Sequence, residues 1–211
     1  MALPFAAPAR QLVHRRAIDI AVYLRDDALW EVDARLTDVK TRDTPLATGV
    51  RPAGEPIHDL LLRLVIDERF NVIEAGARSD RVPYPGQCDD HGDSFARLVG
   101  LNLLRGFRAA VDERLGGVLG CTHLTELSRV LPTAVVQAFA GRVLDTCGTG
   151  DVPPFQIDRC RVLRSDGPVV RAHYPRWYRA RGAMSSALDR DSDTAPAAAS
   201  ALPSLLPKDT L

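Results

Sequence analysis

A cysteine and a histidine stand one residue apart in the stretch Gly120-Cys121-Thr122-His123, and both side chains can take part in chemistry. The apolar residues that follow recur at helical spacing: Leu124, Leu127, Leu131, Val135 and Ala138. This spacing places Cys121 and His123 at or just before the N-terminus of a helix. Free backbone N–H groups and the positive end of the helix dipole favour a thiolate or a bound anion there.

Cys88 and the pair His58-Asp59 add further ligands to this region, in a set suited to zinc or iron. In this metal hypothesis His58, Cys88 and Cys121 hold the ion. Asp59 then orients His58 or supplies a ligand, and His123 shuttles a proton. A simpler alternative makes the cysteines small buried hydrophobic side chains and the histidines hydrogen-bonded structural groups.

Thiol chemistry is the second option for Cys121. At a helix N-terminus beside His123, its thiolate can act as a nucleophile or as a sulfur carrier. The competing interpretation is that Thr122 caps the helix and the thiol beside it is inert. The residues expected to be catalytic are therefore Cys121, His123 and Asp59.

Other polar groups carry weaker signals. Four carboxylates lie near a lysine and are able to form an acid–base site at a sheet edge, or simply to form turns and solvated faces: Asp26, Asp27, Asp33 and Asp38, with Lys40. The basic run His14-Arg15-Arg16 is predicted to lie on the surface. Cys147 and Cys160 flank a loop, and the sequence leaves open whether they meet or are buried singly.

Strands precede the cysteine-bearing segments. Alternating or continuous apolar patterns predict strands over 17–24, 29–40, 60–67 and 72–79, with Ile73, Ala75 and Ala77 of the last turned inward. Residues 41–57 hold three prolines and two glycines and are predicted to form a loop. The four strands are expected to form one antiparallel sheet.

Helical spacing takes over after the loop that carries Cys88. A helix is predicted from Phe95 to Leu115, with Gly100 as a break and Gly116-Gly117 as its end. Pro132 is expected to kink the Cys121 helix or to split it in two. The predicted fold is α+β, a four-stranded antiparallel sheet packed on one side by helices.

Composition limits the classes of function. The 211 residues contain 27 basic and 27 acidic side chains, so no overall charge favours nucleic acid or an anionic membrane. No apolar run approaches the roughly 18 residues that span a bilayer, and four cysteines do not make a disulfide framework. We expect a cytoplasmic protein with a flexible arm over 1–13, a single domain over 14–180 and a disordered tail over 181–211.

Several motifs together resemble a bacterial family classed as a domain of unknown function, number 2889. They are Arg25-Asp26-Asp27-x-Leu29-Trp30, Thr37-Asp38-x-Lys40, Pro56-Ile57-His58-Asp59, Pro83-Tyr84-x-x-x-Cys88, Leu98-x-Gly100-Leu101, Gly120-Cys121-Thr122-His123-Leu124 and Tyr174-Pro175-Arg176-Trp177. The order of elements is also similar to the NifU/SufE-like fold of iron–sulfur scaffolds. That likeness implies ligands at three places, where this chain has His58-Asp59, Cys88 and Cys121, so the first place lacks the expected cysteine.

These observations favour a small metal-dependent or thiol-dependent enzyme that acts on a small molecule. The alternative is a non-enzymatic accessory or scaffold protein that holds a metal or a sulfur species for a partner protein. A third interpretation is an interaction domain whose polar residues are structural.

Overall fold

The computed structural model describes residues 9–89 and 94–180. The predicted disordered tail and residues 1–8 of the predicted arm lie outside the described residues. The chain divides into two compact units, with the boundary between Leu144 and Asp145.

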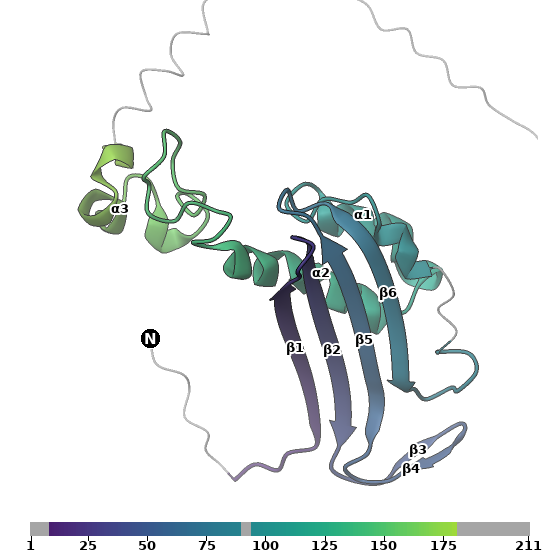
Figure 1. Cartoon of the computed structure of the whole chain (residues 1–211). Helices are drawn as coiled ribbons and strands as arrows, with labels where there is room; N and C mark the ends of the chain where they lie inside the picture. The colour runs from purple at the N-terminus through teal and green to yellow at the C-terminus, as the bar shows by residue number, and fades with distance from the viewer. Residues whose placement is uncertain (1–8, 90–93, 181–211) are drawn as a thin grey trace, which may run out of the picture. The chain divides into compact units, whose positions relative to one another are not determined.

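The first unit is built on a four-stranded antiparallel sheet, as predicted (Figure 1). Its strands are β1 (His14–Leu24), β2 (Trp30–Lys40), β5 (Pro56–Ile66) and β6 (Val72–Arg81), and they lie side by side in that order. The turn between β1 and β2 is closed by a hydrogen bond from the Arg25 N–H to the Leu29 carbonyl, 2.9 Å long. This short turn fixes the register, which pairs Leu24 with Trp30 and Arg16 with Asp38.

The predicted loop over 41–57 contains a small hairpin, formed by β3 (Thr44–Leu46) and β4 (Gly49–Arg51). Strands of three residues are too short to show an alternating pattern, so the sequence did not reveal them. The prediction that Ile73 faces inward is wrong, since its side chain is 43% exposed. A bulge pairs Val65 with Glu74 but Ile66 with Val72, which leaves Ile73 outside the alternation.

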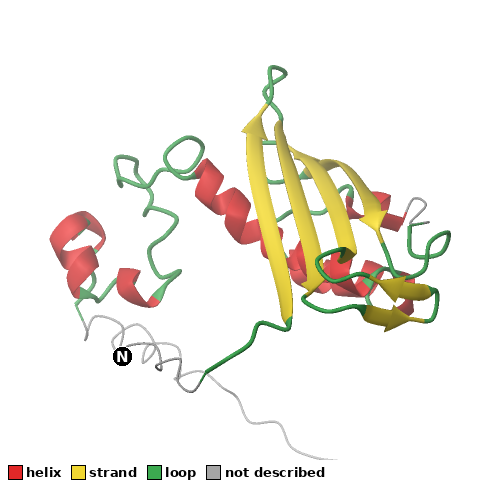
Figure 2. Ribbon diagram, turned by 90° about the horizontal axis from the view of Figure 1, so that it is seen from below, coloured by secondary structure: helices red, strands yellow, loops and turns green. Residues whose placement is uncertain are grey.

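Helices cover one face of the sheet, as Figure 2 shows. The predicted helix over 95–115 is two elements, the 3-10 turn η1 (Ser94–Leu98) and α1 (Phe107–Leu115). Gly100 lies between them with φ +81°, a conformation that glycine adopts without strain, so the predicted break is confirmed. A second 3-10 turn, η2 (Gly117–Leu119), leads into α2 (Thr122–Phe139), which begins where the sequence predicts.

The core lies between α2 and the covered face of the sheet. Every second residue of β2 and β5 is buried against apolar side chains of the helix: Val32, Leu36, Leu60, Leu62 and Leu64 from the strands, and Leu124, Leu127, Leu131, Val135 and Phe139 from α2. The helix runs through Pro132 without interruption, so it is not split. The packed apolar stripe outweighs the hydrogen bond that proline removes.

The second unit is short and mostly irregular. It contains η3 (Arg161–Leu163), α3 (Pro168–His173) and η4 (Pro175–Trp177). The Asp145 carboxylate accepts hydrogen bonds from the N–H groups of Cys147, Gly148 and Gly150 and so organises the first loop. Cys147 and Cys160 are both exposed and free. Within the described residues, none of the helices is both long enough and apolar enough to cross a bilayer.

Candidate functional site

Asp38 is the centre of a polar network at the end of β2. It lies on the covered face, two residues beyond Leu36, and is only 4% exposed. Its strand neighbour Arg16 donates from Nε to Oδ1 and from Nη2 to Oδ2, both at 2.9 Å, and His14 Nε2 lies 2.9 Å from Oδ1. Burial opposes the charged form, but the hydrogen bonds from Arg16 and His14 prevail and lower the pKa of Asp38 to about 2.

His58 joins the network from the next strand. It is the cross-strand partner of Asp38, and its Nδ1 lies 3.1 Å from Oδ2 of that carboxylate. Burial and the neighbouring His123 lower the pKa of His58, although Asp38 acts in the opposite direction. The register of β1, β2 and β5 thus places Arg16, Asp38 and His58 in one row across the sheet.

The start of α2 supplies the groups above this row. Cys121 is the N-cap residue, and its carbonyl accepts the hydrogen bond from the Thr125 N–H, 2.9 Å long. Gly120, which precedes it, has no room for a side chain, because an added Cβ would lie 2.8 Å from the Leu115 carbonyl oxygen. Only glycine lets the chain pass so close to the end of α1 and enter α2 at this point.

Cys121 and His123 form a pair at this helix start. The Cys121 Sγ lies 3.9 Å from His123 Nδ1. Burial raises the pKa of the Cys121 thiol, but the contact with His123 and the first-turn backbone N–H groups outweigh it, so that the pKa is lowered. The same contact raises the pKa of His123 against the effect of burial. Both shifts favour a thiolate beside an imidazolium.

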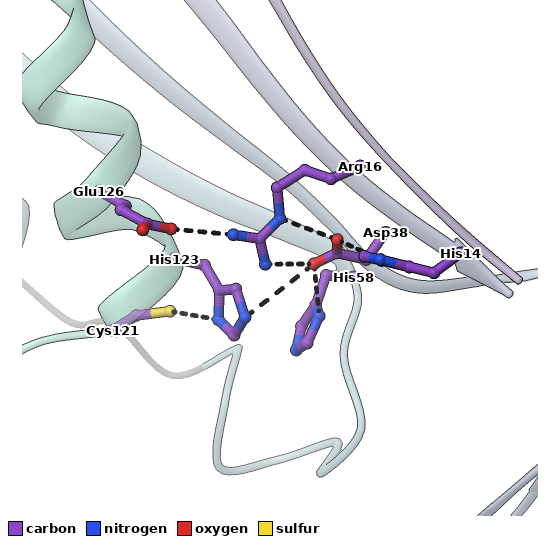
Figure 3. A network of polar contacts seen from close by, with 7 residues as sticks. All are labelled: His14, Arg16, Asp38, His58, Cys121, His123 and Glu126. Carbon is purple, nitrogen blue, oxygen red and sulfur yellow. Dashed lines mark hydrogen bonds and ion pairs between the residues drawn. The ribbon is translucent and has the colours of Figure 1, made fainter. Parts of the chain in front are cut away.

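The two groups of residues meet at His123. Its Nε2 lies 4.0 Å from Asp38 Oδ2, and its ring packs against that of His58 with centroids 3.9 Å apart and a tilt of 35° between the planes. Figure 3 shows His123 between Cys121 and Asp38, so that a thiol, an imidazole and a carboxylate follow one another. Arg16 adds a second link, because its Nη1 donates to Glu126 Oε2 of α2 at 2.9 Å.

A pocket of about 430 Å³ opens beside this pair. Cys121 and His123 line it together with Cys88, Phe95, Val118 and Leu119, among other residues. Cys88 therefore lies in the same pocket as Cys121, from the loop where the sequence places it.

A different set of residues has its possible ligand atoms close enough together to contact one metal ion. Ligand atoms of Asp38, His58 and His123 all lie within 4.8 Å of one another, and this is the one such group of three or more found among the described residues. The predicted set was His58, Cys88 and Cys121, of which only His58 belongs to the group. Carboxylate and imidazole donors suit zinc or iron as well as the predicted thiolates do.

The structure does not bring Asp59 to the site. Successive residues of a strand point to opposite faces, so Asp59 lies on the face away from His58. Its carboxylate is held there by Arg35, which donates from Nε and Nη2 at 2.7 and 2.5 Å. The carboxylate beside His58 is therefore Asp38 and not the predicted Asp59.

The predicted carboxylate site at the sheet edge is also not assembled. Asp33 lies on the open face and pairs with Arg63, while Asp27 pairs with Arg25 in the turn. Of the two carboxylates of that set that lie on β2, only Asp38 is on the covered face. Arg16, His14 and Glu126 are not among the predicted site residues, and the signal for Arg16 is the register of the first hairpin, which pairs it with Asp38.

The fold and the site together define a class: an α+β protein whose sheet and helix start bring a cysteine and two histidines around one buried carboxylate. The chain belongs to the family described as "Protein of unknown function (DUF2889)", whose model matches residues 14–137. That match includes every residue of the network, from His14 to Glu126. No curated protein and no solved structure matches the chain. The likeness to iron–sulfur scaffolds stays a prediction.

Proposed function

We propose that this protein is a thiol-dependent enzyme in which Cys121 attacks an electrophilic carbon of a small molecule. The main support for the proposal is that His123 links two groups: its Nδ1 contacts Cys121 Sγ, and its Nε2 lies near Asp38. A nucleophile, a base and a group that orients the base, in this order, are the usual parts of nucleophilic catalysis. The long contacts of 3.9 and 4.0 Å suit a free enzyme, in which such contacts are often loose.

The position of Cys121 supports this assignment over an inert thiol. Its side chain is half-buried, yet it lies in the wall of a pocket and beside first-turn N–H groups of α2. A purely structural cysteine needs neither an imidazole partner nor access from solvent.

The two histidines differ in a way that suits acid and base roles. The pKa of His123 is raised and that of His58 is lowered, although both face the same carboxylate. Environments that separate two pKa values in this manner commonly define an acid and a base. His123, as the imidazolium, donates a proton to the leaving group. His58 points Nδ1 at Asp38, which leaves Nε2 as the nitrogen able to accept a proton.

Labelling with small electrophiles tests the proposal. The full-length protein is treated with an excess of iodoacetamide for short times near neutral pH, and each cysteine is quantified by peptide mass spectrometry. The proposal predicts that Cys121 reacts before Cys147 and Cys160, although those two are the exposed ones. Labelling in the order of exposure would contradict it. Fast labelling without turnover of any substrate would favour a non-enzymatic sulfur carrier.

Metal binding is the second candidate function, because three ligand atoms of Asp38, His58 and His123 converge. It ranks second because Arg16 already donates to both oxygens of Asp38, and its positive charge would oppose a cation there. Elemental analysis of protein purified without a metal-binding tag tests it. Near-stoichiometric zinc or iron that disappears in His123→Ala but persists in Cys88→Ser would support this site, and its absence from wild type would count against it.

A further inference from the structure

We infer that the pocket beside Cys121 receives the uncharged, apolar acyl group of a carboxylic ester or thioester. This inference rests on the proposed function and specifies its substrate class. The reaction would be acyl transfer to Cys121 followed by hydrolysis.

The part of the pocket wall that the structure describes carries charge only at the Cys121–His123 pair. Of the described residues that line it, none is Asp, Glu, Lys or Arg. The apolar part is made by Phe95, which is buried, and by Val118 and Leu119 of η2. A charge on the part of the acyl group that lies against Phe95, Val118 and Leu119 would lose its hydration, and no Lys or Arg stands among the described lining residues to pair with it. An apolar acyl group would instead cover the side chains of Val118 and Leu119, which are otherwise exposed to water.

Val118 and Leu119 indicate where that group lies. The Val118 side chain is fully exposed and Leu119 is 50% exposed, which is unusual for two adjacent large apolar residues beside a pocket. They are held there by the turn that precedes Gly120, whose close approach to Leu115 fixes the path of the chain. The pocket volume of about 430 Å³ is near the lower end of the range for small-molecule sites. This size suits a short or aromatic acyl group better than a long chain.

The chemistry balances with the residues present. The Cys121 thiolate forms a bond to the carbonyl carbon, and the electron pair moves to the carbonyl oxygen. When that pair returns, the bond to the leaving alcohol or thiol breaks, and His123 gives that group its proton. Water then attacks the thioester carbon and loses a proton to a histidine, which releases the carboxylic acid and restores the thiolate.

A matched pair of esters tests the inference. Para-nitrophenyl butyrate and the para-nitrophenyl monoester of succinate have acyl chains of the same length, but succinate adds a carboxylate. The inference predicts a kcat/KM roughly tenfold or more in favour of butyrate, and a fall for the hexadecanoate ester. Equal rates for butyrate and succinate would overturn it.

Variants of Val118, at the exposed edge of the pocket, test the acyl pocket independently of the proposed function. Val118→Lys places a positive charge on a fully exposed position, so the fold should be unaffected, with Val118→Thr as the uncharged control. The butyrate preference should fall several-fold in Val118→Lys only, because the ammonium group pairs with the succinate carboxylate, while iodoacetamide labels Cys121 at the wild-type rate. An unchanged preference would overturn the acyl pocket alone, whereas slow labelling of wild-type Cys121 would overturn the proposed function.

Discussion

Asp38 and Asp59 lie on neighbouring strands, and an arginine holds both oxygens of each, yet only Asp38 belongs to the candidate site. Both are buried, at 4% and 6% exposure, and each arginine stands on an adjacent strand. The difference is the face of the sheet. Above Asp38 lies the start of α2 with Cys121 and His123, whereas no described helix of residues 9–144 packs on the face of Asp59 (Figures 1 and 2).

A carboxylate that is paired only with an arginine, as Asp59 is, has a structural role. Asp59 and Arg35 neutralise each other on the open face, next to Asp33 and Arg63, which do the same. Asp38 also has His58 and His123 beside it, so its charge acts on groups that can change protonation state. The covered face should therefore carry the chemistry, and the open face should contribute only to stability.

The largest expected effect comes from Cys121→Ser on the covered side. Because a serine hydroxyl is a far weaker nucleophile than a thiolate, ester turnover should fall by about a thousandfold or more. The melting temperature should change little, since Cys121 is at a helix end. Cys147→Ser is the matched control and should keep full turnover. Residual turnover in Cys121→Ser close to the wild-type rate would refute a nucleophilic role.

Replacement of Asp38 and of Asp59 by asparagine should lower the stability of the protein by different amounts. Asp38→Asn should lower the free energy of unfolding by about 2–4 kcal/mol, because it leaves the donors of Arg16 and His14 without a charged acceptor. Asp59→Asn should cost less, about 1–2 kcal/mol, since the Arg35 side chain is 53% exposed and water can replace the lost partner. Urea denaturation measures both values.

The same two variants should also differ in ester turnover. Asp38→Asn should also lower ester turnover, because His58 and His123 lose the group that orients them, while Asp59→Asn should keep wild-type turnover. If Asp59→Asn abolished turnover in a folded protein, the assignment of chemistry to the covered face would be wrong.

Acid should weaken the fold through Asp38. Its pKa is lowered from 3.8 to about 2 in the folded protein, so the carboxylate form stabilises the fold at any pH above the unfolded value. This contribution, about 2–3 kcal/mol, should be lost as the pH falls from about 5 to about 2. The difference in unfolding free energy between wild type and Asp38→Asn should shrink over that window. A constant difference would show that Asp38 has an ordinary pKa.

The smallest effect is expected for Glu126→Gln. The Glu126 side chain is 54% exposed, and its ion pair with Arg16 is accessible to water and salt. We expect a loss below about 1 kcal/mol and turnover within about twofold of wild type. A loss as large as that of Asp38→Asn would mean that Glu126, and not Asp38, positions Arg16.

Much of the fold follows from the sequence because its signals are local. The alternation in 29–40, the apolar run in 60–67 and the glycine–cysteine start of α2 each predict an element that the structure contains. The errors arise where the pattern is interrupted, as at the bulge that turns Ile73 outward. The small hairpin within 41–57 has too few residues to carry a pattern.

The site was harder to predict because it depends on contacts between distant residues. Cys121, His123 and His58 draw attention in the sequence because their side chains are rare and reactive, and the structure brings the three close together. The sequence favours Asp59 because it is the neighbour of His58 in the chain, whereas strand alternation separates their side chains and cross-strand pairing places Asp38 beside His58. How near His123 comes to Asp38 depends on how α2 packs on the sheet, which no local pattern encodes.

The most direct test of the account is the ionisation of the Cys121 thiol. Ultraviolet absorbance of the thiolate can be followed against pH in the triple variant Cys88→Ser/Cys147→Ser/Cys160→Ser, in which Cys121 is the only cysteine. We expect the midpoint of thiolate formation to lie below the usual pKa of about 8.5, and to rise when His123→Ala is added. A midpoint at or above that value, unchanged by His123→Ala, would contradict a thiolate–imidazolium pair at the start of α2.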